Sequence, residues 1–319
     1  MGIPGRPRDR GTAVLAALRS AGPRQYAAIV AGVGAVATVR ARKRIGLGSG
    51  PATACAFALP LSVAAGFERS RVRDGGVWAA QMWAYKNAFE MPADDEQRLR
   101  RRAHFDYPIA VDRIIGAGTP PSQRLARLLR RRGHLSALDK ALTFFYWTWE
   151  AEPHLAMGWI RLRRPEHFAS AAGRLAATFD LTLLGYWIVP SAPPWWVSEK
   201  LGRMNGEVRR VMAEVADWVK QKPNPTEGEH EMGANPFAAM PSDHFASAAM
   251  TAILLTEQDR RLGLFAWSYT LGLGFVLVYL GEHYVVDLLA GLALALGVNA
   301  ARQGLECVAE RVLALGPGR

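Results

Sequence analysis

Two short segments of this chain carry residues whose types and spacing could do chemistry. The first is Gly281–Asp287 (GEHYVVD), at the junction of two apolar runs. His283 and Asp287 are four residues apart, a spacing that brings two side chains to one face of a helix. A carboxylate bonded to one imidazole nitrogen fixes the tautomer and leaves the other nitrogen free to attack as a nucleophile. A purely structural pair inside a helix bundle has the same spacing, so both interpretations stay open here.

The second segment is Pro241–His244 (PSDH), which opens an apolar run. Ser242 is a favourable N-cap residue, so the pattern predicts a helix that starts around Asp243. The first N–H groups of such a helix and its positive dipole end can cradle a phosphate. The alternative is an ordinary capped helix with an incidental histidine at position 244.

Apolar runs are the elements that must position these residues. The chain has 319 residues, 50% of them hydrophobic and 21% charged, with a mean hydropathy of +0.00, so apolar and charged stretches alternate. Several runs approach the roughly 20 residues that cross a bilayer. These runs are 51–67, 141–160, 168–190, 241–256, 262–281 and 284–300, while 25–39 is short. The prediction is an all-α integral membrane bundle of about six transmembrane helices, with a soluble all-helical protein as the alternative.

The order of the predicted spans places the two motifs together. His244 begins one span and His283 follows the next, so both fall on the same side of the membrane. The segment Pro190–Trp196 (PSAPPWW) ends an earlier span on that side. Its tryptophans suit the aromatic belt of a membrane interface.

The charge balance is strongly basic, with Lys+Arg 39, Asp+Glu 28 and a net charge of +11. Residues 98–132 contain ten arginines and two acids. Within them, Leu125, Leu128 and Leu129 share one helical face, which indicates an interfacial helix on anionic lipid or, alternatively, a solvated connector. Nucleic acid is not an expected partner, because no recognised binding motif accompanies the charge.

The remaining organisation follows composition. We expect a basic, partly disordered N-terminal region over 1–50 and a first span with the basic interfacial segment over 51–140. A catalytic membrane core follows over 141–300, and a C-terminal tail over 301–319. Residues 201–220 predict an amphipathic helix and 221–236 a loop. Two cysteines, Cys55 and Cys307, exclude a disulfide framework and a cysteine-rich metal site.

Three blocks, PSAPPWW, NPFAAMPSDHFA and YLGEHYVVDLLAG, resemble the type-2 phosphatidic acid phosphatase superfamily of membrane lipid phosphatases. The resemblance covers roughly residues 107–300. Within the superfamily, the blocks are most similar to the branch of inositol phosphorylceramide synthases and their bacterial relatives. It implies that His283 is the nucleophile, forming a phosphohistidine, and that Asp287 orients it. His244 would be the general acid and then the base, Ser242 would help hold the phosphoryl oxygens, and no metal or other cofactor would be needed.

The chain departs from the family pattern at several positions. Asp243 replaces a glycine, which places a carboxylate beside the phosphate unless it turns away, and Leu277 replaces an arginine. The Lys and Arg-Pro of the first block are missing. Lys200 and Arg203 are the nearest residues that could replace these phosphate-binding cations; alternatively, they are solvated charges at the membrane interface. Arg113, in the basic segment, is a second candidate source of positive charge for the phosphate. The predicted phosphate-binding set is therefore Ser242, Asp243, Lys200 and Arg203.

Glu150, in the run 141–160, is predicted to be a satisfied core carboxylate, with a substrate contact as the alternative. The basic short loops 161–167 and 257–262 are predicted to be cytoplasmic, which would place the site at the extracytoplasmic side of the plasma membrane. The opposite orientation is the alternative, because the basic segment 98–132 would lie on the same side as the site.

The resemblance implies a lipid phosphatase or phosphoryl (head-group) transferase that acts on a phospholipid or polyprenyl phosphate among membrane lipids. The alternative is a catalytically inactive lipid-binding or scaffold protein on the same fold. Nothing in the sequence indicates an oligomeric state.

Overall fold

The structure is a computed structural model that describes residues 22–130, 134–221 and 235–317. These residues form α-helices and short 3₁₀ helices, and no strand longer than an isolated bridge occurs among them. The predicted all-α class is confirmed. The disorder predicted over 1–24 and the loop predicted over 221–236 fall almost entirely outside the described residues.

The chain forms two compact units. The first comprises the described residues up to Asn87 together with those from Glu310 onward. It holds α2 (Pro23–Ala41), α3 (Ser49–Gly66) and most of α4 (Arg71–Glu90), a helix that the sequence reading did not anticipate. The buried Arg73 side chain joins its parts, because its guanidinium donates to the carbonyls of Ala64 and Leu313.

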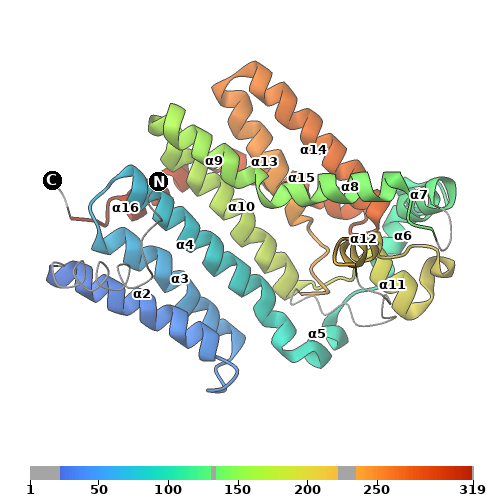
Figure 1. Cartoon of the computed structure of the whole chain (residues 1–319), viewed down its shortest axis with the longest axis horizontal. Coiled ribbons are helices and arrows are strands. Elements are labelled where there is room, and N and C mark those ends of the chain that lie inside the picture. Colours follow the sequence, from blue (N-terminus) through green and yellow to red (C-terminus); the bar gives the residue numbers. More distant parts are fainter. Residues whose placement is uncertain (1–21, 131–133, 222–234, 318–319) are drawn as a thin grey trace, which may run out of the picture. The chain divides into compact units, whose positions relative to one another are not determined.

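The second unit, Ala88–Ala309, contains both sequence motifs. Its helices are shown in Figure 1. They are η1 (Met91–Asp95), α5 (Glu96–Arg102), α6 (Asp106–Ile115), α7 (Pro121–Leu129), α8 (Ala137–Trp147), η2 (Thr148–Glu150), α9 (Glu152–Arg163), η3 (Pro165–His167), α10 (Phe168–Ile188), α11 (Pro194–Leu201), η4 (Arg203–Gly206), α12 (Val211–Val219), α13 (Asp243–Gln258), α14 (Arg260–Leu280), α15 (Val285–Ala300) and α16 (Arg302–Leu313), whose last residues belong to the first unit.

Helix α13 is the centre of this unit. It packs against α14, α15, α10 and α9, and it forms an antiparallel hairpin with α14 (Figure 1). Its buried residues include a series of alanines, and small side chains let neighbouring helices approach closely. The approach of α15 to α13 is close at Gly291 of α15, where a Cβ would lie only 2.6 Å from the Ser242 carbonyl oxygen. The start of α13 is therefore held against the start of α15.

Fewer helices than predicted have the length and composition of a membrane span. Among the described residues, α3 and α14 qualify, and the pair α15 and α16, bent by 72°, adds a third if it counts as one span. Helices α13 and α15 have 16 residues each, and α10 has 21 residues but contains Arg174 and Asp180. The run 141–160 is not one helix, because η2 separates α8 from α9. A six-span bundle is thus not established by helix length.

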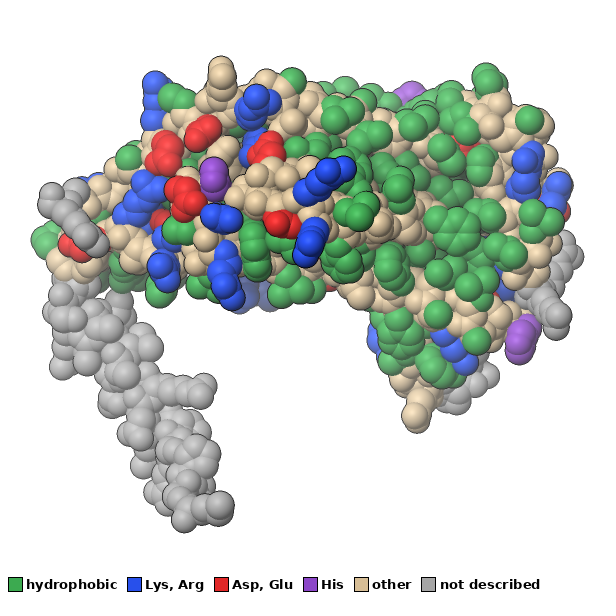
Figure 2. All heavy atoms as spheres, turned by 90° about the horizontal axis from the view of Figure 1, so that it is seen from above, with side chains coloured by type: hydrophobic (Ala, Val, Ile, Leu, Met, Phe, Trp, Pro, Cys, Tyr) green, Lys and Arg blue, Asp and Glu red, His purple; other side chains and the backbone are tan. Residues whose placement is uncertain are grey.

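Large hydrophobic side chains nevertheless lie exposed along the long helices. Leu184 and Ile188 of α10 are 53% and 68% exposed, and Phe265 of α14 is 73% exposed. Figure 2 shows broad areas of hydrophobic side chains on the face that it draws. Apolar surface of this extent is unusual for a soluble monomer and fits a membrane protein.

Two predicted helices in the charged segments have different outcomes. Helix α7 forms where Leu125, Leu128 and Leu129 predicted it, with Leu128 72% exposed. The helix predicted over 201–220 begins only at Val211. Positive φ angles at Gly202, Met204 and Asn205 turn the chain between α11 and α12, and two glycines in this stretch were the sequence signal for that turn.

Candidate active site

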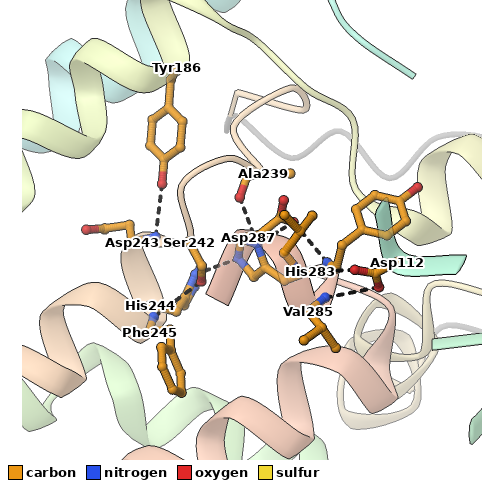
Figure 3. Close-up of polar contacts among 12 residues, drawn as sticks. Asp112, Tyr186, Ala239, Ser242, Asp243, His244, Phe245, His283, Val285 and Asp287 are labelled. Atoms are coloured by element: carbon orange, nitrogen blue, oxygen red, sulfur yellow. Dashed lines mark hydrogen bonds and ion pairs between the residues drawn. The ribbon is translucent and has the colours of Figure 1, made fainter. Parts of the chain in front are cut away.

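His283 lies in the turn between α14 and α15 rather than on a helix (Figure 3). Gly281 ends α14 with a φ of 75°, and a Cβ there would lie 2.5 Å from Val208, so glycine suits both the backbone and the space. The Leu277 carbonyl then accepts from the backbone N–H of Glu282 and of His283. Leu277 itself is buried in the core, so this position supplies a backbone acceptor where the family pattern has a cationic side chain.

The predicted contact between His283 and Asp287 is present. Asp287 Oδ2 lies 3.4 Å from His283 Nδ1 and accepts from the Tyr284 N–H at 2.9 Å, so this carboxylate also caps α15. The His283 imidazole has a second partner, the Ala239 carbonyl oxygen, 3.0 Å from the same Nδ1 (Figure 3). A carbonyl oxygen can only accept, so Nδ1 carries the proton and Nε2 of the neutral ring keeps its lone pair.

Ala239 is held in place by the PSAPPWW segment. Ser191 lies between two extended pieces of chain, forming isolated bridges with His104 and Ala238. Its N–H donates to the Phe237 carbonyl, and its own carbonyl accepts from the Ala239 N–H. The first block thus supports the carbonyl that orients His283.

His244 meets His283 from the first turn of α13, which begins at Asp243 as predicted. Its Nδ1 lies 3.3 Å from His283 Nε2, so the two motifs come together (Figure 3). Ser242 is the N-cap, and its Oγ accepts from the Phe245 N–H at 3.3 Å. The Ser242 N–H donates to the Asp287 carbonyl at 3.0 Å, which ties the two helix starts to each other.

The N-terminus of α13 offers fewer free donors than the sequence suggested. The Phe245 N–H is engaged by Ser242, and the Asp243 N–H donates to the Tyr186 hydroxyl at 3.1 Å. The Asp243 carboxylate turns toward α10, where its Oδ1 accepts from Thr182 Oγ1 at 3.2 Å. In Figure 3 it points away from both histidines. The replacement of the family's glycine therefore does not place this charge against the reacting nitrogens.

The predicted cationic residues lie on the surface. Lys200 is exposed in the last turn of α11. Arg203 is 55% exposed and forms an ion pair with Asp106 at 3.2 Å, and Arg113 is also exposed. Neither Lys200 nor Arg203 makes a described contact with either histidine, so their role in phosphate binding stays a prediction. Glu150 is exposed at the end of η2, so its prediction as a core carboxylate is wrong: the break between α8 and α9 brings it to the surface.

A buried charged group that the sequence reading missed lies beside Glu282, the residue before His283. Arg210 is 5% exposed, and its guanidinium carbon lies 4.0 Å from the centre of the Trp195 ring. Its Nε is 3.8 Å from a carboxylate oxygen of Glu282, the residue before His283. Burial raises the pKa of Glu282, while the charges of Arg210 and His283 oppose that rise. Trp195, in PSAPPWW, was the one available sequence signal, because aromatic faces attract guanidinium groups.

Asp112 of α6 is a second missed residue. Its two carboxylate oxygens accept from the backbone N–H groups of Val285 and Val286, at 3.1 and 3.0 Å. The side chain is fully buried. It therefore caps the start of α15, two residues after His283, and fixes the turn that presents His283 (Figure 3). Burial raises the pKa of Asp112 to about 6, with a further contribution from the charge of Asp287, while the two N–H groups lower it.

This arrangement predicts a pH dependence that depends on Asp112. Its pKa of about 6 exceeds the ordinary value of 3.8, so the folded protein holds the proton more tightly than the unfolded chain does. The free energy of unfolding should therefore fall as the pH rises between about 4 and 6. Asp112→Asn has no such proton to lose, and we expect this part of the slope to disappear in denaturation followed in detergent. Asp106→Asn, an exposed carboxylate on the same helix, is the control. An unchanged slope in Asp112→Asn would contradict the assignment.

No metal site is apparent around these residues. In the part of the chain that the structure describes, no group of three or more His, Cys, Asp or Glu side chains could hold an ion. The expected independence from metals stays a prediction.

Comparison with known proteins identifies the family of this chain. A family model described as the PAP2 superfamily matches residues 118–301, which include both histidines, Asp287 and Arg210. No curated protein and no solved structure gives a significant match. The matched region covers more than half of the chain and contains the two segments that carry His244 and His283. The chain therefore belongs to the PAP2 superfamily.

Proposed function

We propose that this protein is a membrane lipid phosphatase or phosphoryl transferase that works through a phosphohistidine on His283. Membership of the PAP2 superfamily supports phosphatase or phosphotransferase activity in general. The observation that carries the specific mechanism is the orientation of His283. With Nδ1 held by the Ala239 carbonyl and Asp287, its lone pair at Nε2 faces His244.

The reaction follows from these positions. The Nε2 lone pair of His283 attacks phosphorus, and the bond from phosphorus to the lipid oxygen breaks. His244, in its imidazolium form, gives its Nδ1 proton to that oxygen and becomes neutral. Asp287 stabilises the positive charge that the His283 ring gains. Water or an acceptor alcohol then loses a proton to Nδ1 of the neutral His244, which restores the imidazolium, and attacks phosphorus, which breaks the P–N bond. His283 Nε2 and His244 Nδ1 are only 3.3 Å apart, so the two rings must separate to admit the phosphoryl group.

The phosphate needs positive charge, and we assign that role first to Arg210. A helix N-terminus supplies only about half a unit of charge, and two of the N–H groups of α13 are already engaged. Arg210 is buried and lies next to the residue that precedes the nucleophile. Lys200 and Arg203 remain the candidates from the sequence, with Ser242 and Asp243 flanking the phosphate at the start of α13.

The proposal includes a setting in the membrane. The six spans would be formed by α3, the α8–α9 region, α10, α13, α14 and α15. With the basic loops 161–167 and 257–262 in the cytoplasm, the site would lie at the extracytoplasmic side of the plasma membrane. The motif blocks favour the branch that resembles inositol phosphorylceramide synthases. The substrate would be a phospholipid or a polyprenyl phosphate.

An inactive scaffold on the same fold is the less favoured alternative. Each reacting nitrogen has a hydrogen-bond partner suited to its role, and Asp243, the most disruptive departure from the family pattern, faces away.

The deciding experiment incubates purified protein in detergent with phosphatidic acid, phosphatidylinositol and polyprenyl phosphates, with and without an alcohol acceptor. Phosphate release indicates a phosphatase, and head-group exchange indicates a transferase. Absence of both reactions across the panel, with folded protein, would favour the scaffold.

We expect turnover to be unaffected by chelators, because the mechanism draws on histidines and an arginine alone. Vanadate, which adopts the five-coordinate geometry of a transferring phosphoryl group, should inhibit. The measurement is initial rate against chelator and vanadate concentration. Loss of activity with chelator, restored by one divalent ion, would overturn the mechanism.

A further inference from the structure

The His244 ring is clamped by aromatic residues of the α8–η2 segment. The Tyr146 hydroxyl lies 2.8 Å from His244 Nε2, and the Trp149 ring centre lies 4.1 Å from that of His244. Trp149 is itself fixed, since its indole N–H donates to Ser247 Oγ at 2.9 Å. Ser247 in turn donates to the Asp243 carbonyl at 2.8 Å, one turn earlier on α13. The clamp therefore ties α8 and η2 to the turn that carries His244.

The hydrogen bonds assign the protons along this chain of groups. His283 Nδ1 must be a donor, because the Ala239 carbonyl can only accept, so His283 Nε2 is an acceptor. His244 Nδ1, 3.3 Å away, must then donate to it. A neutral His244 with a proton on Nδ1 has a lone pair on Nε2, and the Tyr146 hydroxyl is the donor that satisfies it.

We infer that Tyr146 is the positioning residue that orients His244 and fixes which of its nitrogens carries the proton. The inference rests on the proposed function for its effect on turnover, whereas the protonation pattern itself does not. A hydroxyl is suited to both states of a general acid–base. In the free site it donates to Nε2 of neutral His244. During the reaction it accepts from Nε2–H, both in the imidazolium that acts as the acid and in the neutral form that remains after Nδ1 gives up its proton and then acts as the base. Phenylalanine can do neither.

Tyr146 does not reach the reacting atoms, so its effect passes through His244. Without the hydroxyl, Nε2 loses its partner in a largely apolar, aromatic surrounding. The two neutral tautomers of His244 then become closer in energy. The imidazolium and the Nε2–H form that acts as the base also lose the acceptor for their Nε2–H. The expected consequence is a lower kcat with little change in KM.

The chain offers a matched control in Tyr269 of α14. Its hydroxyl lies 3.0 Å from Thr148 Oγ1, and its ring packs 5.1 Å from that of Phe145. It thus contacts the same segment as Tyr146 and loses the same single atom on substitution by phenylalanine. It makes no described contact with His244 or His283.

The test combines NMR with kinetics. In wild-type protein labelled with ¹⁵N-histidine, we expect His244 to show a protonated Nδ1 and an unprotonated Nε2 near neutral pH. In Tyr146→Phe we expect a mixture of tautomers, a kcat lowered about 10- to 100-fold with KM within about threefold, and a displaced pH profile of kcat. Tyr269→Phe should match wild type in all three.

Several results would overturn the inference. One is a wild-type His244 protonated on Nε2, which needs no variant and so does not depend on the folding of Tyr146→Phe. Another is Tyr146→Phe with unchanged tautomer, kcat and pH profile in an active enzyme. If no lipid phosphate is turned over by the wild type, the proposed function fails, yet the tautomer in wild type and Tyr146→Phe still decides this inference.

Discussion

Replacing His283 with asparagine or alanine is expected to lower kcat by several orders of magnitude, about 10⁴-fold or more, because the nucleophile itself is lost. Asparagine is the sharper variant. Its amide N–H₂ can still donate to the Ala239 carbonyl, which His283 Nδ1 contacts at 3.0 Å, so the turn between α14 and α15 keeps a support. The loss would then report on chemistry rather than on folding.

The intermediate can be observed directly. Acid-stable labelling is not expected of a phosphohistidine, so the reaction with lipid carrying ³²P in its phosphate should be stopped in alkali. Label on wild-type protein and none on His283→Asn is the expected result. His167→Asn is the control, because His167 is an exposed histidine in η3, at the other end of α10 from Tyr186. Activity of His283→Asn within tenfold of wild type would remove His283 from this role.

Replacing Arg210 with alanine is expected to produce the second-largest loss, about 10²- to 10³-fold in kcat/KM, which is typical of removing one preorganised group that stabilises developing charge. Arg210 is buried, so its charge is screened less by water and salt than that of an exposed side chain. It stacks on Trp195 and lies beside Glu282, directly before the nucleophile. Arg210→Lys should recover part of the activity, since it keeps the charge but not the planar fork.

The substitution also leaves Glu282 buried without its cation, which can destabilise the fold. Arg210→Ala combined with Glu282→Gln removes that unpaired charge and separates a loss of phosphate binding from a loss of stability, with thermal unfolding measured for each variant. The double variant Lys200→Ala, Arg203→Ala tests the candidates named from the sequence. Near wild-type activity is expected there, because both side chains are exposed. The reverse order of effects would assign the phosphate to those two residues.

Local patterns of residues were enough to predict the local features of this protein. The apolar runs predicted the long helices of the core, and Ser242 predicted where α13 begins, because helix formation and capping depend on residues within a few positions of each other. The spacing of His283 and Asp287 predicted their contact for the same reason. Local patterns also contained the breaks that the sequence reading passed over. Pro153, at the start of α9, divides the run 141–160, and Gly202 ends α11.

The contacts that hold His244 and His283 depend on residues far apart in the sequence. Asp112 reaches Val285 across 173 residues of chain, and Tyr146 reaches His244 across 98. No periodicity links residues so far apart in sequence, because such pairs form only when packed helices bring them together. Asp243 illustrates the same limit. Its residue type suggested a charge against the phosphate. In the structure its carboxylate accepts from Thr182 and its backbone N–H donates to Tyr186, both on α10, a helix that only the packing of α13 places beside it.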